Sequence, residues 1–187
     1  MSRVLVPVAA GFEEIEAITI IDVLRRGGIK VIIGSLTHNL LVSGAHDIVI
    51  KADCHIADLS VNDLDMIVLP GGWNATKALA SDETVKKILK EMNSQGKEIG
   101  AICAAPYALS VAGVLKDGYT CYPGIEDEIA TAGYDSKKMV VESENIITSR
   151  GPATAICFAL AIVKKLAGSD VYAEVQTDLL ADNCPSS

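Results

Sequence analysis

Aromatic residues and basic charge are both scarce in this sequence of 187 residues. Phe, Trp and Tyr together make up 4% of the chain, and 16 Lys and Arg stand against 24 Asp and Glu, which gives a formal net charge of −8. Nucleic acids and anionic membranes select basic surfaces, and single-stranded nucleic acids also stack on aromatic rings. The composition therefore argues against a nucleic-acid or membrane partner and favours a folded, acidic protein.

Paired cysteines are missing as well. The five cysteines lie far apart and include no Cys-x-x-Cys pair; they are Cys54, Cys103, Cys121, Cys157 and Cys184. This spacing disfavours a disulfide framework or a zinc site and favours a reducing, cytoplasmic location. The longest segment without charged residues, Ile99 to Leu115, is interrupted by Pro106 and Ser110, so we expect no membrane span.

Histidine occurs only before the candidate nucleophile Cys103. The three histidines are His38, His46 and His55. In hydrolase-like sheets the catalytic base follows the nucleophile along the chain, so an ordinary Cys–His pair in that order is excluded. The chain also lacks a Gly-x-Gly-x-x-Gly or Walker pattern, and Asp53 with His55 makes a poor ligand set. We therefore expect no cofactor and no metal.

Short β-branched runs alternate with segments of helical period, which indicates a parallel sheet covered on both faces. We predict an α/β fold, a doubly wound and mostly parallel sheet with helices on both faces, in one domain over residues 1–187. The predicted strands are Arg3–Ala9, Ile29–Ser35, Met66–Leu69, Glu98–Ile102 and Ile146–Thr148, with a small antiparallel pair at Leu40–Val42 and Asp47–Lys51. The predicted helices are Glu13–Arg26, Glu83–Ser94, Ala104–Val114, Ala153–Leu166 and Asp170–Leu180, before a loose tail at Asn183–Ser187.

The turns that follow the predicted strands hold the candidate site, because ligands of such sheets bind at the carboxyl ends of the strands. Cys103 stands at one such corner, between small residues, where the positive end of a following helix favours a thiolate. The alternative is a buried cysteine that acts as a small apolar side chain. We interpret Cys103 as the reactive thiol. The cysteines interpreted as ordinary core residues are Cys54, Cys121 and Cys157.

Glu16 is the second candidate. It lies in line with Ile20 and Val23 on the apolar stripe of the first predicted helix. It is therefore either a buried acid with a raised pKa or a first-turn charge that complements the helix dipole. If Glu16 reaches Cys103, its protonated carboxyl donates a hydrogen bond to the thiolate.

The third element is the pair Gly71 and Gly72 after a predicted strand. Two glycines let the backbone come close to a ligand, although the same residues also make an ordinary turn. The N–H groups of Gly72 and Ala104 are candidates to hold a developing oxyanion.

With these residues the sequence resembles the ThiJ/PfpI superfamily, in particular the branch of the Parkinson-disease protein DJ-one. The matching segments span about Arg3 to Leu180 and are Gly11, Glu13–Glu16, Asp22–Val31, Val68–Gly72, Ala101–Pro106 and Thr148–Pro152. The resemblance implies a flavodoxin-like fold, a homodimer, and a reactive Cys103 paired with a protonated Glu16. It implies a pocket formed by Gly71, Gly72, Ala104, Tyr122, Gly151 and Pro152.

Two positions depart from the superfamily. The protease-like branch carries His directly after the cysteine, where this chain has Ala104, which argues against peptidase activity. Near relatives have His-Pro about twenty residues after the nucleophile, where this chain has Tyr122-Pro123. A phenol then replaces an imidazole, and His46 offered across a dimer interface is one possible substitute.

The resemblance implies a glutathione-independent glyoxalase or protein deglycase, a hydrolase or lyase that protects against carbonyl and oxidative stress. Its substrate is a small reactive carbonyl such as methylglyoxal, or a glycated protein. The alternative is a redox-sensing cysteine protein or redox-dependent chaperone without significant turnover. A flavodoxin-like binding module is the third hypothesis.

Overall fold

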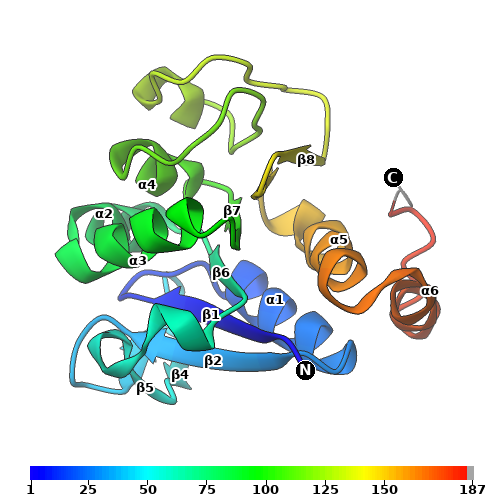
Figure 1. Cartoon of the computed structure of the whole chain (residues 1–187), viewed down its shortest axis with the longest axis horizontal. Coiled ribbons are helices and arrows are strands. Elements are labelled where there is room, and N and C mark those ends of the chain that lie inside the picture. The colour runs from blue at the N-terminus through cyan, green and yellow to red at the C-terminus, as the bar shows by residue number, and fades with distance from the viewer. Residues whose placement is uncertain (185–187) are drawn as a thin grey trace.

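A seven-stranded sheet forms the centre of the protein, which is described here by a computed structural model over residues 1–184 (Figure 1). Its strand order is β5-β2-β1-β6-β7-β9-β8, and every neighbouring pair is parallel except β8 with β9. The strands are β1 (Arg3–Val8), β2 (Lys30–Ser35), β5 (Cys54–His55), β6 (Met66–Leu69), β7 (Glu98–Ile102), β8 (Val140–Ser143) and β9 (Ile146–Ser149). The expected α/β fold with a mostly parallel sheet is confirmed.

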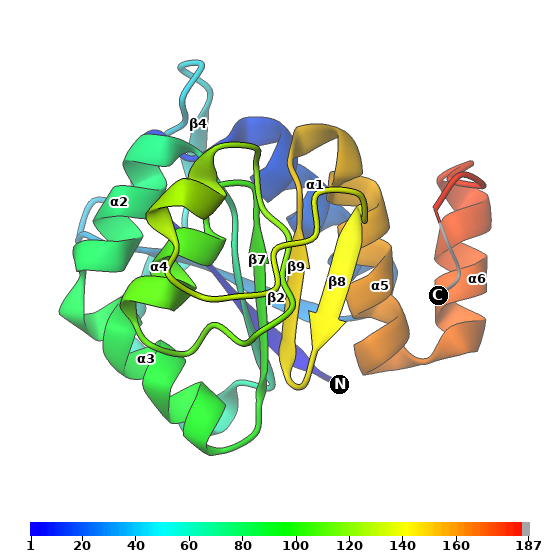
Figure 2. The ribbon, with the colours of Figure 1, turned by 90° about the horizontal axis from the view of Figure 1, so that it is seen from above.

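Helices cover both faces of the sheet because alternate side chains of each strand enter different apolar layers. In β1, Val4, Val6 and Val8 pack with one layer, and Leu5 packs with the other. The helices of the first layer are α1 (Glu14–Arg26), α5 (Ala155–Ala167) and α6 (Ser169–Asp178), and those of the second are α2 (Trp73–Ser81), α3 (Glu83–Ser94) and α4 (Pro106–Val111) (Figures 1 and 2).

A separate antiparallel hairpin, β3 (Leu41–Ser43) with β4 (Val49–Lys51), projects from the body of the molecule (Figure 2). Its backbone is joined to the start of α1, because the Gly11 N–H donates to the Ser43 carbonyl at 2.9 Å and the Ala45 N–H donates to the Phe12 carbonyl at 2.9 Å. The hairpin therefore borders the turn that leads into α1.

The sequence predicted the central elements closely. The strands Met66–Leu69 and Glu98–Ile102 and the helix Glu83–Ser94 have the predicted bounds, and the predicted antiparallel pair is the β3–β4 hairpin. The helix expected over Ala104–Val114 is shorter, because Cys103 and Ala104 form a turn before α4. The missed elements include α2, whose small and polar residues follow two glycines, and the two edge strands β5 and β8, which are short or only half-buried, as well as the short 3-10 helices.

A disulfide joins Cys157 of α5 to Cys184, so the expectation of no disulfide was wrong, as was the interpretation of Cys157 as a free core residue. The two cysteines are 27 positions apart, and a turn between α5 and α6 brings the chain back. Spacing along the sequence does not reveal such a return. Cys184 is buried, so this part of the predicted tail is not loose, and residues 185–187 lie outside the described residues.

Within the described part of the chain, no helix has the length and apolar character needed to cross a bilayer.

Candidate active site

Cys103 occupies a sharp corner directly after β7. Its backbone has a φ of 64°, a conformation that a residue with a side chain adopts at a cost. Two bonds hold this corner: the Cys103 N–H donates to the Ser149 carbonyl at 2.9 Å, and the Tyr122 N–H donates to the Cys103 carbonyl at 2.9 Å. The sulfur itself receives hydrogen bonds from the N–H groups of Gly72 and Ala104.

Glu16 lies in the first turn of α1 and is fully buried. Its Oε2 accepts a hydrogen bond from the Gly71 N–H at 2.8 Å, and its side chain also hydrogen-bonds with Cys103. The N-cap residue Glu13 fixes the start of the helix by accepting the Glu16 N–H at 2.7 Å. The predicted pair of a thiol and a buried acid is thus brought together.

Gly71 separates the two side chains so closely that no larger residue fits. A Cβ atom at this position would lie 2.6 Å from the Cys103 Cβ, 2.6 Å from the Glu16 Oε2 and 3.0 Å from the Cys103 sulfur. Gly72 likewise admits no side chain, because its φ is 89° and a Cβ atom there would lie 2.3 Å from the Gly11 carbonyl oxygen. The two glycines therefore allow the contact between Glu16 and Cys103.

Burial raises the pKa of the Glu16 carboxyl to about 7, although hydrogen bonds with Cys103 and the Gly71 N–H oppose this. Burial, and after it the negative charge of ionised Glu16, raises the pKa of the Cys103 thiol, while the Gly72 and Ala104 N–H groups lower it. Part of the rise in the pKa of Cys103 comes from the charge of ionised Glu16 and is lost when Glu16 is protonated, so the two groups titrate as a coupled pair that shares one proton near neutral pH. Two N–H donors face the partly exposed sulfur and one faces the buried carboxyl, so we infer that Glu16 carries this proton and Cys103 the charge.

Comparison with known proteins supports a family assignment for a chain with this fold and site. The sequence matches the DJ-1/PfpI family over residues 2–165. It is 40% identical over 178 residues to the protein dj-1beta of Drosophila melanogaster, covering 94% of this chain and 95% of the relative. The chain belongs to the DJ-1/PfpI family.

A solved structure and one further relative extend the comparison. The crystal structure of Drosophila melanogaster DJ-1beta superposes with a TM-score of 0.93, at 40% identity, and the match covers 96% of this chain and 98% of that one. The glutathione-independent glyoxalase DJR-1.2 of Caenorhabditis elegans is 38% identical over 160 residues, 84% of each chain. The ThiJ/PfpI resemblance and the flavodoxin-like fold expected from it are therefore confirmed.

In this DJ-1/PfpI-family chain, the remaining predicted pocket residues line a small cavity of about 190 Å³ beside the Cys103 corner. Tyr122, Gly151 and Pro152 share its walls with Arg150, and Tyr122 is 51% exposed. The Tyr122 ring lies against Gly151, where a Cβ would be 3.2 Å from the ring edge. The backbone bond from Tyr122 to Cys103 places this residue next to the thiol's corner, and Arg150 of the same cavity hydrogen-bonds with Tyr134.

His46 is held within its own chain. Its Nδ1 lies 2.8 Å from the Glu14 Oε2, and its backbone N–H donates to the Glu14 Oε1 at 2.6 Å. Glu13, Glu14 and His46 each place one possible metal-ligand atom within 4.8 Å of the others. Because Glu14 accepts both bonds from His46 and Glu13 caps α1, we assign this cluster to joining the hairpin with the helix.

Several supporting residues of this DJ-1/PfpI-family site were missed in the sequence. Ser149 accepts the Cys103 N–H, Glu13 orders the turn that carries Glu16, and Arg150 lines the small cavity. All three lie inside segments that carried the family resemblance, so the motif marked them without showing their contacts.

Substitutions at Glu16 test which group carries the shared proton. Gln cannot ionise but keeps a hydrogen-bond donor beside Cys103, whereas Leu has neither an ionisable group nor a donor. Since a hydrogen bond to a charged group contributes about 1.5–3 kcal/mol, the rate of Cys103 alkylation by iodoacetamide at pH 7 should fall about tenfold in Glu16→Leu and stay near the wild-type rate in Glu16→Gln. Above pH 7, where Glu16 ionises, Glu16→Gln should react faster than wild type.

A Cys54→Ser background removes the partly exposed Cys54 thiol from this measurement. A faster reaction of Glu16→Leu than of wild type at pH 7 would show that Glu16 acts there as a repelling carboxylate, and the inference would be abandoned.

Gly71→Ala should disrupt the pair, because its Cβ overlaps both Cys103 and Glu16. We expect the alkylation rate of Cys103 at pH 7 to change by at least about tenfold, since small displacements at such sites have large effects. The matched control is Gly28→Ala, a positive-φ glycine with open space around it, which should lower stability by about 1 kcal/mol and leave the rate unchanged. Equal rates in both variants would argue against a sterically defined site.

Proposed function

We propose that the protein is a cysteine-dependent enzyme that acts on methylglyoxal-type carbonyls or on their adducts with proteins. The observation that supports this is the contact of the Cys103 sulfur with a buried acid and two backbone N–H groups. Such a site supplies a nucleophile, a proton donor and donors for a developing oxyanion. The name of the Caenorhabditis elegans relative, a glutathione-independent glyoxalase, points to the same chemistry.

In the proposed reaction, the Cys103 thiolate adds to the aldehyde carbon of methylglyoxal. The oxygen that becomes negative lies near the Gly72 and Ala104 N–H groups and takes the proton of Glu16, which gives a hemithioacetal. Glu16, now a carboxylate, removes the proton from the former aldehyde carbon and returns it to the neighbouring carbon, while the proton of the hemithioacetal hydroxyl passes to the former ketone oxygen. Water hydrolyses the resulting thioester, which releases lactate and restores the Cys103 thiolate; of the two protons set free, one returns to Glu16 and the other goes to solvent.

Glu16 alone carries these proton transfers in our proposal, because a phenol stands at Tyr122. Tyr122, Gly151 and Pro152 line the small cavity next to the Cys103 corner, and we place the methyl group of the substrate or the side chain of a glycated protein there. Arg150 lines the same cavity, and its positive charge suits a carbonyl compound with an anionic end.

The second candidate function is redox sensing, or a redox-dependent chaperone, at the same cysteine. Oxidation of Cys103 to a sulfinate adds oxygen atoms that a protonated Glu16 is placed to hydrogen-bond. The Glu16 Oε1, which has no hydrogen-bond partner among residues 1–184, favours this alternative.

We also propose a homodimer of single-domain chains in the cytoplasm. Ile15 and Ile18 are exposed on α1, and Ile48 and Val49 are exposed on the hairpin that is bonded to its start. Apolar side chains gathered on neighbouring elements are typical of a protein interface. A second copy of the chain is the proposed occupant.

The activity is tested by following lactate formation from methylglyoxal. Cys103→Ser should lower kcat/KM at least about a thousandfold, because it removes the nucleophile, and Glu16→Gln should lower it about a hundredfold or more while the thiol stays reactive. The matched control is Cys121→Ser, which replaces another free cysteine and should retain activity.

Full lactate production by Cys103→Ala would end the proposal. Preferential oxidation of Cys103 by mild peroxide, seen by mass spectrometry in a protein with negligible turnover, would favour the sensor instead.

Substitution of the exposed apolar residues tests the dimer. Ile48→Asp places a charge in the proposed interface, so analytical ultracentrifugation should show a dimer for wild type and a monomer for this variant. Val111→Asp, at an exposed residue of α4, is the control and should remain a dimer. A wild-type monomer at micromolar concentration would contradict the proposal.

A further inference from the structure

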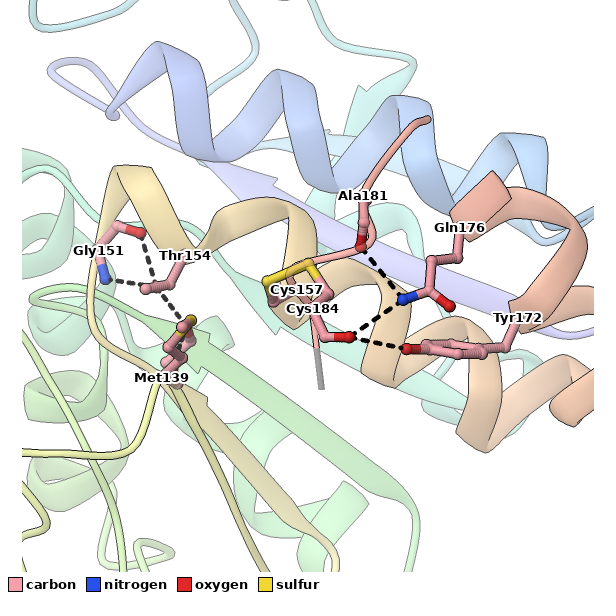
Figure 3. The surroundings of a disulfide bond; sticks show 9 residues. Met139, Gly151, Thr154, Cys157, Tyr172, Gln176, Ala181 and Cys184 are labelled. Carbon is pink, nitrogen blue, oxygen red and sulfur yellow. Dashed lines mark hydrogen bonds between the residues drawn. A yellow bond between two sulfur atoms is a disulfide. The ribbon is translucent and has the colours of Figure 1, made fainter. Parts of the chain in front are cut away.

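The segment after α6 turns back onto α5, and a disulfide fixes it there (Figure 3). Cys157 lies in the first turn of α5, Cys184 follows α6, and their Cα atoms are 5.0 Å apart. This separation falls within the range of about 4.4–6.8 Å found for disulfides. Neither cysteine belongs to the candidate active site.

The other polar contacts of this segment come from α6. Gln176 Nε2 donates to the Ala181 carbonyl at 3.2 Å and to the Cys184 carbonyl at 3.1 Å, and the Tyr172 hydroxyl lies 3.5 Å from the Cys184 carbonyl (Figure 3). Since α6 carries both donors, these bonds hold the segment to α6. The disulfide joins it to α5, and Ala181 and Cys184 pack in the apolar layer to which α5 belongs.

Both cysteines are packed, with exposed fractions of 6% for Cys157 and 5% for Cys184. Between α6 and Cys184 the chain is mostly exposed, because Leu180 is 84% exposed and Asp182 and Asn183 face solvent, while Ala181 packs into the core. Leu180 also has a positive φ of 53°, which its backbone adopts at a cost. Segments of this kind open locally at a lower free energy than the core. Opening this turn exposes the disulfide.

We propose that Cys157 and Cys184 are a second redox site, a reversible dithiol–disulfide pair that locks segment 179–184 onto α5 when oxidised and releases it when reduced. The co-reactant is a dithiol, either a small molecule or a protein. This site is independent of Cys103.

The exchange balances in two steps. A thiolate of the dithiol attacks one sulfur of the Cys157–Cys184 bond, forming a mixed disulfide and freeing the other cysteine as a thiolate, which takes up a proton. The second thiol of the reductant then displaces the remaining cysteine and leaves as a cyclic or protein disulfide. Two electrons and two protons thus pass to the cysteine pair, and the reverse reaction closes the bond.

The proposal is tested on the full chain, equilibrated in buffers with increasing ratios of reduced to oxidised dithiothreitol. Mass spectrometry of peptides from alkylated, non-reduced protein should show the linked Cys157–Cys184 pair converting to two free thiols and back. Chymotrypsin cleavage after Leu179 or Leu180 should become at least tenfold faster on reduction. The wild-type melting temperature should fall by about 5–10 °C, as expected when a loop of this length is no longer closed.

Matched variants separate this site from the others. Chymotrypsin should cleave Cys184→Ser and Cys157→Ser at the rate of the reduced wild-type protein, with or without dithiothreitol. Either variant suffices if the other does not fold. Cys103→Ser and Cys54→Ser should both keep the redox-dependent change in cleavage. Absence of the linked pair in oxidised wild-type protein would overturn the proposal, as would cleavage that does not respond to reduction.

Discussion

The contact between Glu16 and Cys103 depends on the close approach of three turns at the carboxyl edge of the sheet. The Gly71 N–H donates to Glu16, and the Gly71 carbonyl accepts the Glu13 N–H at 3.0 Å, so the turns after β1 and β6 are bonded to each other. Cys103 enters from β7 with a strained backbone. Because parallel neighbouring strands end at the same edge, these groups meet only if β1, β6 and β7 lie side by side, as they do here.

The sequence was most informative where burial and backbone geometry leave few choices. Strands covered on both faces are continuous apolar runs, so β6 and β7 were predicted with their observed bounds. The spacing of Glu16 from Ile20 and Val23 put it on the apolar stripe but left two alternatives, a buried acid or a charge in the first turn, and the structure buries it completely. In the two strands the pattern of the sequence and the burial in the folded protein select the same kinds of residue, so the sequence is sufficient to predict them.

Features that depend on the return of distant segments were not predictable in the same way. The pairing of Cys157 with Cys184 follows from the turn between α5 and α6, and the pairing of Glu14 with His46 follows from the placement of the hairpin beside α1. No periodicity in the sequence encodes either distance. The helix α2 was missed for another reason, since glycines that admit a close backbone approach also resemble a loop.

Within residues 1–184 a thiol lies beside a carboxyl at two places, Cys103 with Glu16 and Cys121 with Glu126, and at both places burial and the carboxylate charge raise the pKa of the thiol. The Cys121 sulfur lies 3.9 Å from the Glu126 Oε2, which also accepts the Gly124 N–H in a partly exposed loop. There the carboxylate can only accept, and burial together with its charge raises the pKa of Cys121 to about 12. At Cys103 the acid is the more deeply buried partner and two backbone N–H groups lower the pKa of the thiol, so we propose that here the acid holds the proton and donates. On this proposal, the relative burial of thiol and carboxyl decides which of these two cysteines is reactive.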